Sequence, residues 1–197
     1  MKIGLIALST DLTIEKDFHS YCKHEVYTTR IIFENPITPK SLKKLQQQIV
    51  EAKLRFPFIM DRYIFGCTSG TAYIGQSNID QCINPLSSCA DFLTYNSIKS
   101  LSLLTPYTEI VHNKVRDWFI EQGFSIENEK YLNYESDLDI AVISENELLK
   151  QISSMGTGVV FASCTSLPMM QLLERTKNTK WLSSNQSMIW KLNNESS

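Results

Sequence analysis

The tripeptide Cys-Thr-Ser occurs twice in this chain of 197 residues, at 67–69 and at 164–166. Each copy directly follows an apolar run, at 63–66 and at 160–163, and precedes a segment with a helical pattern. In open α/β sheets, reactive groups gather at the carboxyl ends of the strands. The repeat therefore predicts two related halves, each presenting a thiol and neighbouring hydroxyl groups just after a strand.

The rest of the chain alternates short runs of β-forming residues with helical patterns, which is typical of parallel α/β sheets. We expect strands over 3–8, 28–33, 63–66, 101–104, 159–162 and 181–183, and a weaker extended segment over 125–134. We expect helices over 39–53, 87–99, 145–152 and 168–175. A long amphipathic helix should begin at Thr105 and Pro106, carry His112 on its polar side and end at Gly123.

Charge and hydropathy exclude two classes of partner. Lys and Arg total 19 against 21 Asp and Glu, which gives a formal net charge of -2. A non-specific nucleic-acid binder carries a basic excess, so we expect no nucleic-acid partner. The longest apolar stretches, 3–8 and 159–162, are far shorter than the roughly 20 residues of a membrane helix, so we expect no membrane partner.

The cysteine count indicates thiol chemistry in a reducing compartment. The five cysteines are an odd number and contain no CxxC pair: Cys22, Cys67, Cys82, Cys89 and Cys164. Reduced thiols in a cytoplasmic protein fit this pattern better than a disulfide framework or a structural zinc site. His19, Cys22 and His24 lie close together but match no zinc spacing, so we expect a surface loop there and no metal.

The two loops suggest a specific chemistry. Helix N-termini after the strands would present backbone N–H groups, which bind anions and lower the pKa of a thiol. If the halves face each other, Cys67 and Cys164 flank one carboxylate-bearing substrate. Such a pair can move a proton at the carbon beside the carboxylate, or add to a double bond and release it after rotation, without a cofactor. The competing interpretation is two inert core cysteines; the duplication at matching positions favours the catalytic pair.

Several further segments accompany the two loops and span nearly the whole chain. In chain order they are Gly4-Leu5-Ile6 with Glu15 after a polar loop, Thr29-Arg30, Gly66-Cys67-Thr68-Ser69-Gly70, Leu104-Thr105-Pro106-Tyr107, Ser163-Cys164-Thr165, and Ser183-Ser184-Asn185-Gln186 ending at Trp190. Together they resemble the aspartate/glutamate racemase superfamily, and within it the branch of maleate cis-trans isomerases and arylmalonate decarboxylases.

The resemblance implies two pseudo-symmetric Rossmann-like (flavodoxin-like) α/β lobes with parallel sheets and an active site in the cleft between them. It assigns 1–86 and 179–197 to the first lobe and 87–178 to the second. It also implies cofactor-free chemistry, with Cys67 as nucleophile and Cys164 as acid. Substrate carboxylates would be held by Thr68 and Ser69 of the first loop and by Thr165 and Ser166 of the second. Tyr107, which follows the strand predicted over 101–104, would hold them as well.

Two positions depart from the pattern of the isomerases. Those enzymes carry asparagines that contact substrate carboxylates, and here Asp11 and Asp137 stand at the matching positions. Asp137 lies in the acidic run 135–139, which by composition alone predicts a solvated loop. Two acids in the site would repel a dicarboxylate such as maleate and suit a substrate that carries an amino group.

The sequence thus favours a cofactor-independent isomerase or racemase whose partner is a small carboxylate substrate. Two alternatives stay open. One is a decarboxylase of the arylmalonate type, against which Cys67 argues because those enzymes keep only the second thiol. The other is a catalytically silent carboxylate-binding protein of the same fold. A homodimer also stays open as the oligomeric state.

Overall fold

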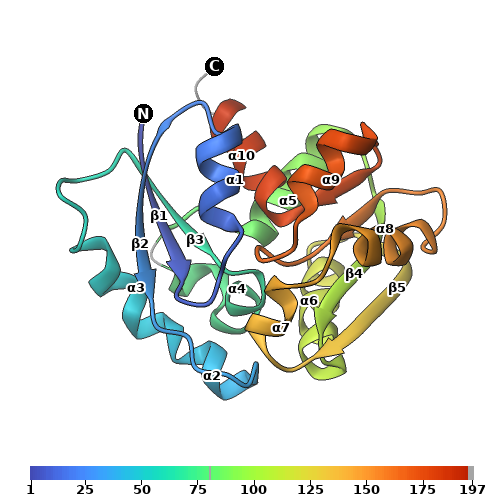
Figure 1. The fold of residues 1–197 in the computed structure, drawn as a ribbon, viewed down its shortest axis with the longest axis horizontal. Coiled ribbons are helices and arrows are strands. Elements are labelled where there is room, and N and C mark those ends of the chain that lie inside the picture. Colours follow the sequence, from blue (N-terminus) through green and yellow to red (C-terminus); the bar gives the residue numbers. More distant parts are fainter. Residues whose placement is uncertain (80, 195–197) are drawn as a thin grey trace.

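The computed structural model describes residues 1–79 and 81–194, which build two parallel sheets (Figure 1). The first contains β1 (Lys2–Leu8), β2 (Glu25–Ile31) and β3 (Arg62–Gly66) in the order β2-β1-β3. The second contains β4 (Ser100–Tyr107), β5 (Ser125–Tyr134), β6 (Val160–Ala162) and β7 (Trp181–Ser183) in the order β5-β4-β6-β7. The predicted α/β fold with two parallel-sheet lobes is confirmed.

The two sheets repeat one topology. In each, the first strand lies in the middle, with the second strand on one side and the third on the other. In the first sheet, an isolated bridge between Ile64 and Ile83 takes the place that β7 takes beside β6. The two Cys-Thr-Ser copies therefore follow equivalent strands, β3 and β6, as the sequence repeat predicts.

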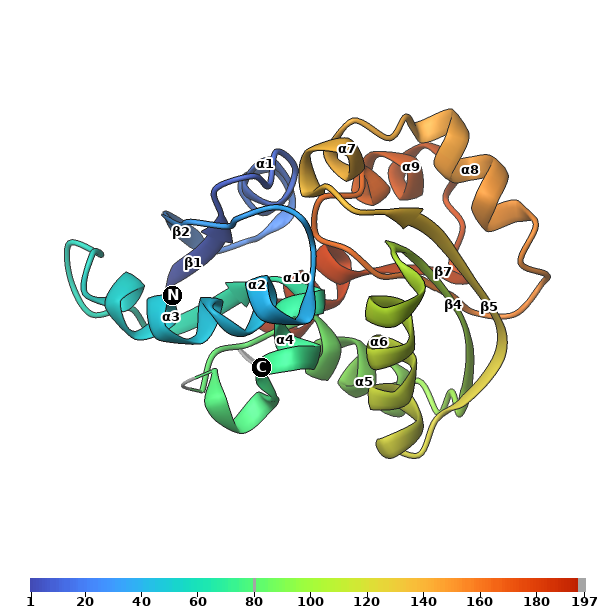
Figure 2. The same cartoon turned by 90° about the horizontal axis from the view of Figure 1, so that it is seen from below.

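Helices cover the sheets in two layers. The first lobe contains α1 (Ile14–Tyr21), α2 (Pro39–Lys43), α3 (Leu45–Lys53), α4 (Thr68–Ile74) and the 3-10 turn η1 (Gln76–Asn78). The second contains α6 (Glu109–Glu121), α7 (Asp137–Ala141), α8 (Glu145–Ser153) and α9 (Met169–Thr176). Figure 2 shows α2, α3, α4, α5 and α6 on one side of the molecule and α1, α7, α8 and α9 on the other. The central strand β1 is buried on both faces as a result, which is typical of parallel sheets.

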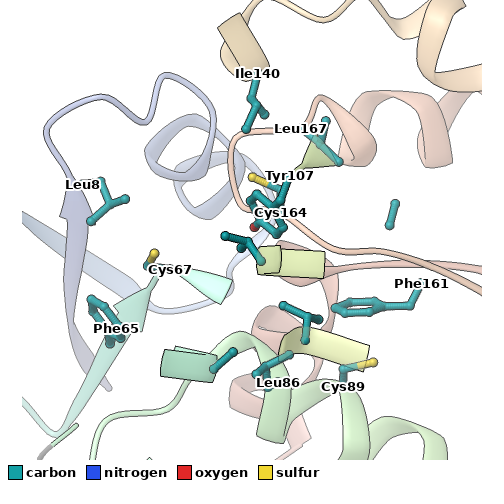
Figure 3. Close-up of a cluster of buried hydrophobic side chains, with 14 of the residues drawn as sticks. Leu8, Phe65, Cys67, Leu86, Cys89, Tyr107, Ile140, Phe161, Cys164 and Leu167 are labelled. Carbon is teal, nitrogen blue, oxygen red and sulfur yellow. The ribbon is translucent and has the colours of Figure 1, made fainter. Parts of the chain in front are cut away.

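Two further helices, α5 (Pro85–Tyr95) and α10 (Ser184–Asn194), pack against each other. Each packs on the other lobe from the strand that precedes it in the chain. Leu86 and Cys89 of α5 share a buried cluster with Phe161 of the second sheet (Figure 3). Met188 of α10 is buried with Leu5 of the first sheet. The chain therefore crosses between the lobes at both helices.

The position of β7 corrects the predicted lobe boundary. We expected 179–197 to return to the first lobe as one piece, but β7 pairs with β6 in the second sheet. This strand covers the edge of β6, whose backbone donors and acceptors would otherwise be unpaired. Only α10 packs on the first lobe, so the crossing begins at Ser184.

The start of the long helix α6 also differs from the prediction. Strand β4 continues through Thr105 and Pro106 to Tyr107, and the helix begins only after Thr108. Pro106 has no N–H to donate, and the register between β4 and β5 shifts at this point. The irregular end of β4 thus accommodates Pro106, although a Thr-Pro pair is also typical of a helix start.

Other boundaries differ more modestly. The strand predicted over 28–33 spans Glu25–Ile31, and the helix predicted over 39–53 is divided at Lys44 into α2 and α3. The sequence patterns did not predict the short helices α1 and α7. Within the described residues, no helix is long and apolar enough to cross a membrane.

Candidate active site

Cys67 lies at the junction of β3 and α4, with its side chain at the helix N-terminus. Its Sγ accepts a hydrogen bond from the backbone N–H of Gly70 at 3.2 Å and lies 3.7 Å from the Oγ of Ser69. This is the position at which a helix accepts a capping group or an anion. The loop thus gives the thiol the N-terminal location that the sequence predicts.

Cys164 follows β6 at the equivalent place in the second lobe. The Ser163 N–H donates to the Leu104 carbonyl at 2.8 Å, which extends the pairing of β6 with β4 up to the cysteine. The Tyr107 hydroxyl at the end of β4 lowers the pKa of the Cys164 thiol, and the thiol raises the pKa of Tyr107. Figure 3 shows Cys67 on the side of the first lobe and Cys164, beside Tyr107, on the side of the second.

Two buried carboxyl groups belong to the same neighbourhood. Asp11 Oδ1 accepts hydrogen bonds of 2.9 Å from the N–H groups of Thr13 and Ile14 at the start of α1, while its buried Oδ2 has no hydrogen-bond partner among the described residues. The Thr165 and Ser166 side chains lower the pKa of this carboxyl group. Asp137, at the start of α7, accepts a hydrogen bond from the Thr10 hydroxyl. The charges of these carboxyl groups raise the pKa of both thiols, and Cys67 and Cys164 lie in one buried cluster.

Burial dominates the protonation of these groups. It raises the pKa of Cys67 to about 12 and the pKa of Cys164 well above its ordinary value, and the charge of Asp137 raises both further. Burial likewise raises the pKa of Asp137 to about 6 and raises the pKa of Asp11, against the helix N–H groups that lower it. Both thiols are therefore protonated at neutral pH in this closed arrangement.

The site is closed to solvent. No predicted site residue is more than 5% exposed: Asp11, Cys67, Thr68, Ser69, Tyr107, Asp137, Cys164, Thr165 and Ser166. Two of the loop hydroxyls bond to protein: Thr68 Oγ1 lies 2.9 Å from Ser184 Oγ, and Thr165 donates to the Gly66 carbonyl at 3.3 Å. A ligand reaches these groups only if the covering segments move.

Hydrogen bonds between the lobes hold this closed form. The Ile37 N–H donates to the Glu135 carbonyl at 2.7 Å, and the Asp137 N–H donates to Asn35 Oδ1 at 2.9 Å. The acidic run that predicted a solvated loop therefore forms the start of α7, with Asp137 directed inward. Its carboxyl group bonds to Thr10 of the first lobe.

His112 lies away from its predicted position. It is buried, with Nδ1 3.0 Å from the Thr105 hydroxyl and Nε2 3.3 Å from Glu129 Oε2. The imidazole thus joins α6 to β4 and β5 instead of facing solvent. Among residues 1–79 and 81–194, no group of three or more His, Cys, Asp or Glu side chains is placed to hold a metal ion.

One buried acid that the sequence patterns do not indicate is connected to the second loop through Asn185. Asp17 of α1 is fully buried and accepts a hydrogen bond from Asn185 Nδ2 at 2.7 Å. Asn185 belongs to the segment 183–186 that carries part of the resemblance, so it could have been singled out. Asp17 could not, because α1 was not predicted and the contact joins residues 168 positions apart.

Gly70 provides a test of how Cys67 is placed. A Cβ added at Gly70 would lie 2.9 Å from the Cys67 sulfur and 3.1 Å from Phe65, so Gly70→Ala must displace the thiol. We expect turnover to fall by roughly tenfold or more, since small displacements of reacting groups are costly. Circular dichroism should show an intact fold, because alanine suits a helix. Wild-type turnover by this variant would contradict the placement.

The comparisons with known proteins bear on the fold. No protein-family model and no curated protein matches the chain in sequence. A Nocardia farcinica maleate cis-trans isomerase mutant with a covalently bound succinylcysteine intermediate is similar in structure, with a TM-score of 0.82 and 14% identity over 98% of this chain and 91% of that one. The chain has the fold of the maleate isomerases.

Two further solved structures support this assignment. The maleate isomerase Iso from Pseudomonas putida S16 gives a TM-score of 0.78 and 14% identity, over 99% of this chain and 92% of that one. A liganded mutant of arylmalonate decarboxylase gives a TM-score of 0.80 and 13% identity, over 98% and 91%. The resemblance to the maleate isomerase and arylmalonate decarboxylase branch is therefore confirmed at the level of the fold.

Proposed function

We propose that this protein is a cofactor-independent isomerase or racemase that acts on a small carboxylic acid through Cys67 and Cys164. One observation carries the proposal: identical Cys-Thr-Ser tripeptides follow equivalent strands of the two lobes, and both cysteines lie in one buried cluster with Tyr107. The fold of the maleate isomerases supports it, since a maleate isomerase of that fold carries a covalent succinylcysteine.

Two reactions suit a pair of thiols. In a racemisation, the thiolate of one cysteine removes the proton from the carbon beside the carboxylate, and the thiol of the other donates a proton to the opposite face. In a cis-trans isomerisation, one thiolate adds to a carbon of the double bond and the second thiol protonates the adjacent carbon. After rotation about the new single bond, the second cysteine takes the proton back and the C–S bond breaks, which restores the double bond and the first thiolate. Both reactions start from one thiolate and one thiol. Because burial keeps both thiols protonated in the closed form, one proton must leave before the reaction starts, as the covering segments move to admit the substrate.

The charges of the site favour one class of substrate. None of the nine proposed site residues is cationic, whereas Asp11 and Asp137 are acids. Like charges about 4 Å apart cost on the order of 4 kcal/mol at an effective dielectric constant near 20. An ammonium group on the substrate would offset these acids, and aspartate and glutamate carry one beside their two carboxylates, whereas maleate carries two carboxylates alone. We therefore propose an amino acid, such as aspartate or glutamate, in preference to maleate.

The substitution Asp11→Asn tests this assignment. Asparagine also accepts hydrogen bonds at a helix N-terminus, so α1 should remain intact. We expect maleate binding to improve by roughly tenfold or more and turnover of aspartate or glutamate enantiomers to decrease, because a like-charge repulsion and an ammonium contact are both removed. The measurement is kcat and KM for all five compounds with both proteins. Rapid maleate turnover by the unmodified protein would overturn the substrate class.

A decarboxylase is the second candidate, because the likeness to arylmalonate decarboxylase is nearly as great as that to the maleate isomerases. Release of CO₂ from an arylmalonate by the unmodified protein would favour it. Binding of small carboxylates without any turnover would indicate a silent binding protein instead.

A further inference from the structure

The buried carboxyl group of Asp17 stands outside the pair of loops but is joined to one of them. Its Oδ2 accepts from Asn185 Nδ2 at 2.7 Å, and its Oδ1 accepts from Gln171 Nε2 at 3.3 Å. The side chain therefore connects α1 of the first lobe with α10 and α9. Burying a carboxyl group costs free energy unless the group is hydrogen-bonded. The two partners of Asp17 can therefore serve the site as well as the stability of the fold.

The amide of Asn185 continues this connection to the second loop. Its Nδ2 also donates to the Thr165 carbonyl at 2.9 Å. Both neighbours of this nitrogen are acceptors, so the amide must present its NH₂ group to Asp17 and Thr165. Its Oδ1 is buried and has no hydrogen-bond partner in the part of the chain that the structure describes. The peptide between Thr165 and Ser166, one residue beyond Cys164, is thus held through the side-chain amide of Asn185.

Two more contacts fix the same loop. Thr165 donates its hydroxyl to the carbonyl of Gly66, the residue before Cys67. Thr13 donates its hydroxyl to the Ser166 carbonyl at 2.9 Å. Thr13 and Asp17 are four residues apart, so they lie on one face of α1. That face holds the second loop at two successive carbonyls, Thr165 through Asn185 and Ser166 directly.

We propose that Asp17 is a positioning residue, which acts through the Asn185 amide on the Thr165 carbonyl and so fixes the Cys164 loop against the Cys67 loop. The inference concerns the placement of a thiol, and only its effect on turnover rests on the proposed function. A merely structural link between α1, α9 and α10 is the competing explanation. Gln171 distinguishes the two, because it contacts the other Asp17 oxygen but not the loop.

The test compares matched amide deletions, Asn185→Ala and Gln171→Ala, by site-resolved alkylation. The reduced proteins are treated with iodoacetamide, and mass spectrometry gives the rate at Cys164 relative to Cys89. Cys89 is fully buried in α5, so it reports general unfolding. We expect the ratio to rise by roughly tenfold in Asn185→Ala, as a loop freed locally opens more often, and to change less than about twofold in Gln171→Ala.

Variants at Asp17 keep the test decisive if Asn185→Ala does not fold. Asp17→Asn retains an oxygen that accepts from Asn185, so the ratio should stay within about twofold of wild type. Asp17→Leu removes the acceptor, and the ratio should rise about fivefold. An unchanged ratio in both Asn185→Ala and Asp17→Leu would overturn the proposal, as would an equal rise in Gln171→Ala.

Turnover provides an independent arm. Displacing one thiol by a fraction of an ångström should reduce kcat in Asn185→Ala by roughly 10²-fold and leave KM within a few-fold, because the misplacement is felt in the reacting geometry. Equal losses in kcat with Gln171→Ala would contradict the positioning role. If the wild-type protein turns over none of the substrates, the proposed function fails, while the alkylation ratios still decide the role of Asp17.

Discussion

Replacing either Cys67 or Cys164 with serine is expected to reduce turnover by roughly 10²–10⁴-fold, the contribution of a well-placed acid or base. A serine hydroxyl keeps the size of the thiol but neither gives up nor returns a proton readily. Both thiols are needed, because one must act as thiolate while the other remains protonated. The measurement is kcat for each variant with the best substrate of the maleate, aspartate and glutamate panel.

Cys22→Ser is the matched control for these variants. Cys22 lies at the end of α1 and is part of neither Cys-Thr-Ser loop, so its replacement should leave kcat within about twofold of wild type, as is usual for substitutions outside a site. Undiminished turnover in Cys67→Ser would instead favour a mechanism with one thiol, as in a decarboxylase.

The contribution of Asp17 to the stability of the protein should decrease as the pH rises from acid to neutral. Burial raises the pKa of Asp17 from 3.8 to about 7, with the charge of Asp11 adding to the shift. The folded protein therefore binds a proton that the unfolded chain has lost over this range. Its free energy of unfolding falls from about pH 4 until about pH 7, by up to about 4 kcal/mol for this group. Asp137, with a pKa of about 6, acts in the same direction.

Urea denaturation of wild type and Asp17→Asn at several pH values measures this effect. Reductant keeps all five cysteines free. His112, whose pKa burial lowers, destabilises the fold as the pH falls below about 6.5, but it does so equally in both proteins. The difference between them isolates Asp17, and the variant should gain stability relative to wild type as the pH rises. Parallel pH profiles would contradict a buried, proton-binding Asp17.

Local sequence patterns predict much of the fold because they reflect burial along one element. The strands β1, β3 and β6 are near-continuous apolar runs, and the repeated loop identifies β3 and β6 as equivalent. The positions of β7 in the second sheet and of α10 on the first lobe are only partly predictable. The pairing of a strand such as β7 depends on which sheet offers an open edge. The predicted start of α6 is wrong for a similar reason, because Thr105-Pro106 is compatible with the start of a helix as well as with an irregular strand end.

The candidate site divides in the same way. The two thiols and their hydroxyl neighbours follow from the repeat, and the structure brings both loops into one buried cluster. The contacts of Asp17 with Asn185 and of His112 with Glu129 join separate elements. Polar residues in such contacts have the local pattern of exposed residues, so only the folded chain shows their burial.

The central claim is that Cys67 and Cys164 together isomerise or racemise a small carboxylic acid without a cofactor. The most direct measurement incubates the reduced wild-type protein in deuterium oxide with EDTA and each enantiomer of aspartate and glutamate, and separately with maleate, followed by proton NMR and chiral chromatography. The account predicts racemised amino acid that carries solvent deuterium beside the carboxylate, and no such product with Cys67→Ser or Cys164→Ser. A folded wild-type protein that converts none of these compounds, or a Cys67→Ser variant that converts them as fast, would contradict it.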